Sequence, residues 1–334
     1  MRSAPMAWLE ITHETRYDYA APVSPAMHLA HLMPLTDTGQ RVARCVVEVE
    51  PAPDERRDAQ DVFGNLRSTF AVIAPHRRLT VRAVSVVGVA ARFAGLQPAA
   101  GPAWDALVAR LRYVALAPFE PAVEFTLPSP RVPRLEVLRA WARPSFSPGR
   151  SVAEAAIDLM HRLHTEFRYE GGATGVDTPL AESFARRRGV CQDFAHVLAG
   201  ALRMLGLPAR YVSGYLLTTP AAGEPALVGA DASHAWVQVW APGTPGVPAD
   251  GWLDLDPTND LVPAAGHVRL AVGRDYGDVA PLRGVIRGGG AHTLSVGVHT
   301  RPLAGPDDAP DEATAGSPTD GTGVAVSLAG QEPS

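Results

Sequence analysis

Apolar and polar residues alternate along much of the first 92 residues, and this period of two predicts β-strands. Within the run 42–50, the apolar face would consist of Ala43, Cys45, Val47 and Val49. Residues 79–89 form a second strand-like run that is rich in valine, and Pro, Gly and Asn mark the turns between such runs. We therefore predict a β-rich N-terminal domain over residues 1–95.

After residue 150 the period changes to 3.6, which predicts helices. Residues 151–167 carry one apolar stripe, and Ser151 and Glu154 have the spacing of a capping box at its start. A second helix is predicted to open at Thr178-Pro179, with the threonine as N-cap, and to stop at Gly189.

A third helix is predicted over residues 191–205, and it has so many apolar positions that we expect it to be buried. Strands are expected after it, over residues 209–218, 234–240 and 252–256. The Pro- and Ala-rich region 96–150 would connect the two parts with short helical pieces. The predicted core therefore spans 151–302, and the tail 303–334, which is poor in large apolar residues, is expected to be disordered.

Composition narrows the class of protein. The chain has 334 residues, 46% of them hydrophobic, so it can bury large cores, and its net charge of -5 argues against a nucleic-acid partner. Two distant cysteines form no disulfide framework, and no apolar run suggests a signal peptide or a membrane span. We therefore expect a cytoplasmic protein with no membrane partner. All 30 basic residues are arginine, which fits a GC-rich coding bias.

Cys191 is the first candidate for chemistry, because it opens the third predicted helix directly after a glycine turn. The dipole and the unpaired amides of a helix N-terminus favour a thiolate, and the Cys191 N–H is a natural donor to an oxyanion. The alternative is a buried structural cysteine. We prefer that interpretation for Cys45, which lies inside a predicted strand.

Two later segments supply the partners that a thiol nucleophile needs. His234 begins a predicted strand, from which an imidazole can act as a base and then as an acid. Asp254 and Asp256 lie two residues apart on the same face of another strand, so alternation does not choose between them. Either carboxylate would accept the Nδ1 proton of His234 and stabilise the imidazolium. Taken singly, each residue also has an ordinary structural interpretation.

Together these segments resemble the transglutaminase-like family, which has a papain-like cysteine fold. The motifs that carry the resemblance are Arg188-Gly189-Val190-Cys191-Gln192-Asp193-Phe194-Ala195, Leu205-Gly206-Leu207-Pro208-Ala209-Arg210-Tyr211, Ser233-His234-Ala235-Trp236 and Asp256-Pro257-Thr258-Asn259. Residues 10–92 look like the β-rich region that precedes the core in bacterial members. The resemblance implies an α+β fold, with Cys191 as nucleophile, His234 as base and Asp256 as the orienting acid.

The resemblance also implies acyl transfer through a thioester, on a protein or peptide substrate and without a cofactor. Cleavage of peptide or isopeptide amides is the first hypothesis, and transamidation of glutamine carboxamides to amines is its rival. A non-catalytic peptide-binding module is the alternative from another class. The calcium sites of animal transglutaminases have no visible counterpart, and Gln192 and Tyr169 are candidate side-chain donors to the oxyanion.

The other histidines give weaker signals. His161 and His164 are three residues apart on a predicted helix, and a solvated face is the simpler interpretation than a shared metal ion. His196 has no predicted role. With no cluster of metal-ligand residues at a typical spacing, we expect no metal site and disfavour a metal-dependent hydrolase.

Overall fold

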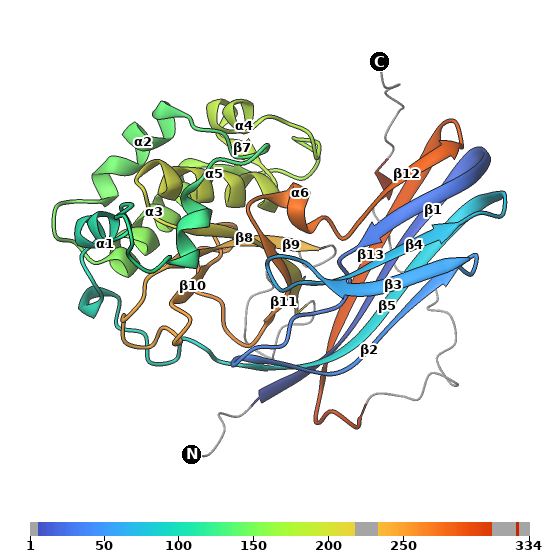
Figure 1. The fold of residues 1–334 in the computed structure, drawn as a ribbon, viewed down its shortest axis with the longest axis horizontal. Coiled ribbons are helices and arrows are strands. Elements are labelled where there is room, and N and C mark those ends of the chain that lie inside the picture. Colours follow the sequence, from blue (N-terminus) through green and yellow to red (C-terminus); the bar gives the residue numbers. More distant parts are fainter. Residues whose placement is uncertain (1–5, 218–232, 309–324, 327–334) are drawn as a thin grey trace.

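The computed structural model describes residues 6–217, 233–308 and 325–326. It contains a large curled antiparallel sheet, a small antiparallel sheet and a group of helices (Figure 1). The helices cover one face of the small sheet, which lies between them and the large sheet. This arrangement confirms the predicted α+β class, in which a helix packs on an antiparallel sheet.

The large sheet is organised around the long strand β1 (Met6–Ala30). The first half of β1 pairs with β5 (His76–Ala90) and β13 (His292–Leu303), and the second half pairs with β4 (Leu66–Val72) and β12 (Leu282–Gly288). The other strands of this sheet are β2 (Gln40–Glu50), β3 (Glu55–Gln60) and β14 (Ala325–Val326). Buried and less buried side chains alternate along the first half of β1, as a period of two predicts.

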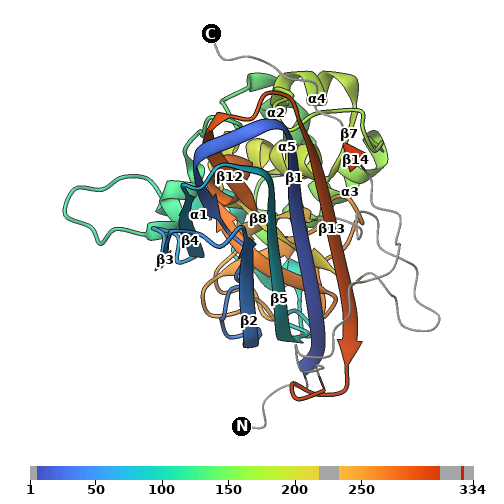
Figure 2. The ribbon, with the colours of Figure 1, turned by 90° about the vertical axis from the view of Figure 1, so that its right-hand side faces the viewer.

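Two strands of the large sheet come from the far end of the chain. The predicted core, 151–302, includes β12 and nearly all of β13, but in the structure both strands pair with β1. Figure 2 shows β13 running beside β1 along almost its whole length. Periodicity predicts that a segment is a strand but not which strand it pairs with. The sequence pattern therefore groups β12 and β13 with the core that precedes them in the chain. Most of the predicted disordered tail, 303–334, lies outside the described residues.

One predicted face of a strand is interrupted. The register of β2 against β5 shifts between Val42 and Arg44, which marks a β-bulge. Ala43 is therefore exposed, although Cys45 and Val47 after the bulge follow the predicted alternation. A bulge inserts one residue and so breaks the period of two.

The small sheet has the strand order β10-β9-β8-β11. Its strands are β8 (Ala209–Leu216), β9 (His234–Trp240), β10 (Trp252–Leu255) and β11 (His267–Gly273). The α-helices are α1 (Trp104–Arg110), α2 (Glu136–Ala142), α3 (Val152–Glu166), α4 (Leu180–Arg186), α5 (Cys191–Met204) and α6 (Tyr276–Val279). Short elements complete the chain: β6 (Arg168–Tyr169), β7 (Arg188–Gly189) and the 3-10 helices Pro98–Ala100, Pro121–Thr126 and Arg143–Ser145. Residue 218, the predicted end of β8, lies outside the described residues.

The small sheet is covered on both faces, which explains why nearly every residue of β8 and all of β9 are buried. On one face, Ala235 and Val237 join the core built around α5. On the other face, Val212 and Trp236 pack against Leu35 and Phe63 of the N-terminal region. Tyr215 and Val268, near the ends of their strands, pack against Leu9 of the large sheet. The expectation that α5 is buried is confirmed, since it is enclosed by this sheet and by other helices. No helix among the described residues is long and apolar enough to cross a membrane.

The first predicted helix begins where expected but without the predicted capping box. Ser151 is the N-cap of α3, yet its hydroxyl donates to the carbonyl of Pro98 instead of accepting from the helix. The Glu154 carboxylate lies 3.2 Å from a guanidinium nitrogen of Arg150. Both predicted capping groups have tertiary partners here, which local spacing does not reveal.

The second predicted helix differs at both ends. Pro179 is the N-cap of α4, and the hydroxyl of Thr178 accepts from the Gly175 N–H. The helix ends at Arg186, and its C-cap Arg187 has a left-handed φ of 53°, so the helix does not reach Gly189. The Arg187 guanidinium stacks 4.3 Å from the centroid of the Phe184 ring, a cation–π contact that stabilises this early end.

Two buried amide side chains of the N-terminal region hold the edge strand β11. Gln40 donates to the Arg269 carbonyl and accepts from the Arg269 N–H, both at 2.7 Å. Asn65 does the same at Val272, at 2.7 and 2.8 Å. Each amide therefore pairs with the free edge of β11 as a neighbouring strand would, which satisfies groups that an edge strand leaves open. These contacts join the two sheets.

We expect Gln40→Leu to lower the free energy of unfolding by about 2–3 kcal/mol, because it leaves buried backbone groups of Arg269 without partners. Gln60→Leu is the matched control, since Gln60 is exposed on β3, and it should change stability by less than about 0.5 kcal/mol. Urea denaturation measures both. Equal effects of the two substitutions would contradict the role of Gln40 in joining the sheets.

Candidate active site

Cys191 is the first residue of α5, and the structure shows how this helix start is held. The N3 residue, Asp193, accepts from the Val190 N–H at 2.9 Å, as the acidic member of a capping box does. The same carboxylate accepts from the hydroxyls of Thr174 and Ser183, each at 2.6 Å. Asp193 thus ties the loop before Cys191 to the first turn. In the sequence, this role of Asp193 is indicated by an acidic residue at the third position of a predicted helix.

Gly189 is required at this helix start for a steric reason. A Cβ atom on Gly189 would lie 2.4 Å from Oδ2 of Asp193. Any other residue would therefore displace the capping carboxylate. The short pairing of β7 with β6 brings the chain to this point, and Glu170 N–H donates to the Gly189 carbonyl at 2.9 Å.

His234 and Asp256 form a fully buried pair. Nε2 of His234 lies 2.9 Å from Oδ2 of Asp256, and both side chains have no exposed surface. Burial lowers the pKa of His234, but the Asp256 carboxylate and the Cys191 side chain raise it by more, to about 10. Burial raises the pKa of Asp256, but the two histidines that it contacts, His234 and His267, hold that pKa far below its ordinary value. The imidazole therefore carries its second proton in the neutral range.

The nitrogen that Asp256 contacts differs from the one predicted. The sequence analysis gives Nδ1 of His234 as the donor to the carboxylate, whereas the structure gives Nε2. The prediction is wrong because strand position fixes which residue meets the carboxylate but does not fix the rotation of its ring. Nδ1 is buried and makes no hydrogen bond of normal geometry with any described residue. Cys191 interacts with the same imidazole through charge and a hydrogen-bonding contact.

Asp256, and not Asp254, is the carboxylate that meets His234. Oδ1 of Asp256 also accepts from the N–H groups of Thr258 and Asn259, at 3.0 and 3.3 Å, and Oδ2 accepts from Asn259 Nδ2 at 2.8 Å. Asp254 instead lies among arginines, 3.4 Å from Arg269 and 3.5 Å from Arg92. Asp254 and Asp256 share one face of the sheet, so their alternation does not choose between them. Their different positions along the chain give them different partners, and only Asp256 reaches His234.

The structure adds one residue that the sequence analysis did not single out. Nε2 of His267, at the start of β11, lies 3.0 Å from Oδ2 of Asp256. Within the part of the chain that the structure describes, His234, Asp256 and His267 are the one grouping of three metal-ligand side chains, with donor atoms within 4.8 Å of one another. These atoms already pair with each other at hydrogen-bonding distances. The expectation of no metal site stays a prediction.

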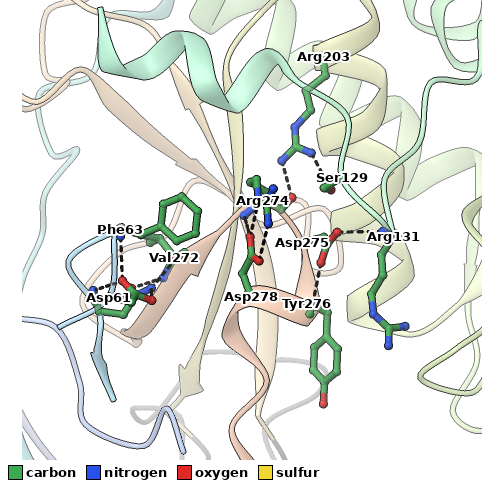
Figure 3. A network of polar contacts seen from close by, with 12 residues as sticks. Asp61, Phe63, Ser129, Arg131, Arg203, Val272, Arg274, Asp275, Tyr276 and Asp278 are labelled. Carbon is green, nitrogen blue, oxygen red and sulfur yellow. Dashed lines mark hydrogen bonds and ion pairs between the residues drawn. The ribbon is translucent and has the colours of Figure 1, made fainter. Parts of the chain in front are cut away.

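Two tyrosines are near enough to Cys191 for its charge to act on them. Burial raises the pKa of both Tyr211 and Tyr276, and the charge of Cys191 contributes to each increase. Figure 3 shows how the turn that carries Tyr276 is held: Asp275 accepts from the Arg131 N–H at 2.9 Å. The Arg131 guanidinium lies 5.6 Å from the centroid of the Tyr276 ring and pairs with Asp177 at 2.8 Å. These contacts fix the position of Tyr276 in the structure.

The two predicted side-chain donors to an oxyanion have other surroundings. Gln192 donates to the Val176 carbonyl at 3.0 Å. The Tyr169 ring lies 6.4 Å from that of Phe194 and is 37% exposed. The charge of Cys191 acts on Tyr211 and Tyr276 instead.

The other three histidines that the sequence analysis considered have structural partners. His196, which has no predicted role, accepts from the Tyr276 N–H at 3.2 Å, and burial lowers its pKa to about 3. Its neutral ring therefore links α5 to α6. His161 is exposed as predicted and lies 2.6 Å from Asp260, and His164 Nδ1 lies 3.3 Å from the Pro257 carbonyl.

Two family models match the chain. Residues 9–88 match the model described as the bacterial transglutaminase-like N-terminal region, and residues 139–257 match the model described as the transglutaminase-like superfamily. The second match includes Cys191, His234 and Asp256. An uncharacterized protein of Mycobacterium tuberculosis is 40% identical over 279 residues, which cover 83% of this chain and 86% of the relative.

Two further similarities concern named proteins. A protein-glutamine gamma-glutamyltransferase of Pseudomonas aeruginosa is 34% identical over 139 residues, which are 41% of this chain and 20% of the relative. The solved structure of a "Putative Cysteine Protease from Cytophaga hutchinsonii" aligns with a TM-score of 0.67 and 20% identity. That alignment covers 90% of this chain and 92% of the other, so the two share one fold over almost their whole length.

We expect iodoacetamide to modify Cys191 well before Cys45 near neutral pH. Burial raises the pKa of the Cys45 thiol, whereas Cys191 lies at a helix start beside a protonated imidazole. The rate of labelling at Cys191 should also depend on pH near 10, because His234 loses its proton there. Timed labelling with peptide mapping measures both rates. Faster labelling at Cys45 would contradict a nucleophilic role for Cys191.

Proposed function

Because the chain belongs to the transglutaminase-like superfamily, we propose that it is a thiol acyl-transfer enzyme with Cys191, His234 and Asp256 as its triad. The observation that carries the proposal is the 2.9 Å contact of Asp256 with an imidazole that also interacts with Cys191. Asp256 orients the ring, His234 exchanges protons and Cys191 supplies the sulfur.

In the proposed reaction, the Cys191 thiolate attacks the carbonyl carbon of an amide and forms a carbon–sulfur bond. The first N–H groups of α5 have no acceptor within the helix and donate to the oxyanion that develops. His234 then gives a proton to the leaving amine, the carbon–nitrogen bond breaks, and a thioester remains on Cys191. The nitrogen or oxygen of an acceptor then attacks the thioester carbon and gives its proton to His234, and the carbon–sulfur bond breaks to restore the Cys191 thiolate.

We propose water as the first acceptor, so that the enzyme cleaves peptide or isopeptide amides of a protein or peptide substrate. The description of the Cytophaga protein as a "Putative Cysteine Protease" agrees with this choice. Transamidation is the second candidate, and the name of the Pseudomonas relative favours it. A peptide-binding module without catalysis would not need the buried pair of His234 and Asp256. The cytoplasmic location and the absence of nucleic-acid and membrane partners stay predictions.

Intact-mass spectrometry tests the proposal. The protein is incubated with a pool of glutamine-containing peptides, with and without a primary amine, and Cys191→Ser is the control. We expect a thioester adduct on the protein together with cleaved, deamidated or amine-bearing peptides, none of which the control produces. Peptides that stay unchanged in every sample, with no adduct, would refute the proposed activity.

We expect Asp256→Asn to reduce turnover by about 10⁴, as the same change does in serine-protease triads, because an amide does not stabilise the imidazolium. Asp260→Asn is the matched control, because Asp260 pairs with the exposed His161 and its removal should change turnover by less than about twofold. Rates of peptide conversion measure both variants.

Asp254→Asn gives a second comparison. It should lower the melting temperature, because Arg92 and Arg269 lose a buried partner. Its effect on turnover should be much smaller than that of Asp256→Asn. A larger loss of turnover in Asp254→Asn would refute the assignment of Asp256.

The composition yields a further prediction about transamidation. Self-crosslinking needs a lysine amine as acceptor, and the sequence contains no lysine. The purified protein, without lysine-containing tags, should therefore form no isopeptide-linked oligomers by itself. Denaturing gels under reducing conditions measure this. High-order oligomers that resist the reductant would show that the acceptor chemistry assumed here is wrong.

A further inference from the structure

One oxygen atom of Asp256 serves two imidazoles. His234 Nε2 lies 2.9 Å from Oδ2, and His267 Nε2 lies 3.0 Å from the same oxygen. Both rings are buried, and their centroids are 6.3 Å apart at an interplanar angle of 66°. The carboxylate is ionised, so each nitrogen must carry a proton to bond with it. His267 therefore competes with His234 for one acceptor.

His267 is held in this position from several directions. It begins β11, opposite Leu216 of β8, and its ring packs edge-on at 5.4 Å from Trp236. Farther along the same strand, Gln40 and Asn65 bind the backbone at Arg269 and Val272. The N-terminal region thus supports the strand that presents His267 to Asp256.

The carboxylate would keep its orientation without His267. The N–H groups of Thr258 and Asn259 donate to Oδ1, and the Asn259 side chain donates to Oδ2. These three donors belong to the turn that carries Asp256 itself. The main effect of His267 is therefore on how the negative charge of Oδ2 is shared, and less on where the carboxylate lies.

We propose that His267 is a positioning residue that shares Oδ2 of Asp256 with His234 and so weakens the hold of Asp256 on the imidazolium. This inference rests on the proposed function, in which His234 must release its proton to the leaving amine. An imidazolium held too tightly by a buried carboxylate is a poor acid at neutral pH. A second donor on the same oxygen counters that hold.

Few other ionisable groups face this pair among the described residues. Cys191 approaches the His234 ring from α5, and His164 of α3 approaches the Pro257 carbonyl. The ion pair of His161 with Asp260 lies at the surface beyond it. Asp254 is bound to its arginines. His267 is thus the group placed to change the charge on Oδ2 directly.

Three variants separate charge sharing from a purely structural role. His267→Phe keeps a ring but removes the donor, and His267→Gln keeps a neutral N–H at the same distance from the backbone. His13→Phe is the matched control, because His13 is equally buried and bonds to Tyr215 and Thr15, away from Asp256. Nitrogen NMR of the imidazole rings follows the titration of His234 in each protein.

We expect His267→Phe to raise the pKa of His234 by roughly one unit, and His267→Gln to restore it. His13→Phe should leave that pKa unchanged even if it lowers stability. No shift, a downward shift, or an equal shift in the control would overturn the proposal. If His267→Phe does not fold, the wild-type spectrum decides: Nε2 of His267 must be protonated at neutral pH, and an unprotonated Nε2 overturns the proposal.

The titration is independent of catalysis, so the two proposals can fail separately. Repeating it in the Cys191→Ser background removes the thiol and leaves both imidazoles on Asp256. A shift there with an inactive wild-type protein would support the role of His267 and refute the proposed function. If the wild-type protein is active but the pKa of His234 does not shift in either background, the proposed function is supported and the role of His267 is refuted.

Discussion

The buried carboxylate of Asp256 is the constraint on which the site depends. An ionised carboxylate without exposed surface is very costly unless donors surround it, and this one accepts five hydrogen bonds. Two come from histidines on separate strands, and three come from its own turn. The need to satisfy this charge fixes β9, β11 and the turn after β10 relative to one another. The imidazole beside Cys191 is held by the same requirement.

The two sheets provide the low-polarity surroundings that make this pair strong. α5 covers one face of the small sheet, and Leu35 and Phe63 of the N-terminal region pack against the other, so its central strands are shielded from water. Gln40 and Asn65 join the sheets by pairing with the open edge of β11. The N-terminal region is therefore part of the support for the site, and the capping carboxylate of Asp193 gives the nucleophile helix a second, independent support.

The sequence predicts features that depend on neighbours in the chain and misses those that depend on distant ones. The 3.6-residue and two-residue periods locate α5 and β9 because burial repeats along each element. Family resemblance selects Asp256 over Asp254, and the two environments in the structure agree with that choice. His267 carries no local mark, since only the pairing of β11 with β8 brings it to Asp256. The partners of Ser151, the ring orientation of His234 and the return of β13 to β1 are likewise tertiary features.

The pairing of β1 with β12 and β13 makes the whole helical core an insertion within one sheet. During synthesis the ribosome delivers β1 early and β13 only after the core. At roughly 5–20 residues per second, β1 waits on the order of ten seconds or longer with one edge unpaired. An open edge of that length is a template for other chains. Nascent or C-terminally shortened forms are therefore expected to aggregate more readily than the full chain, in which β13 pairs with this edge of β1.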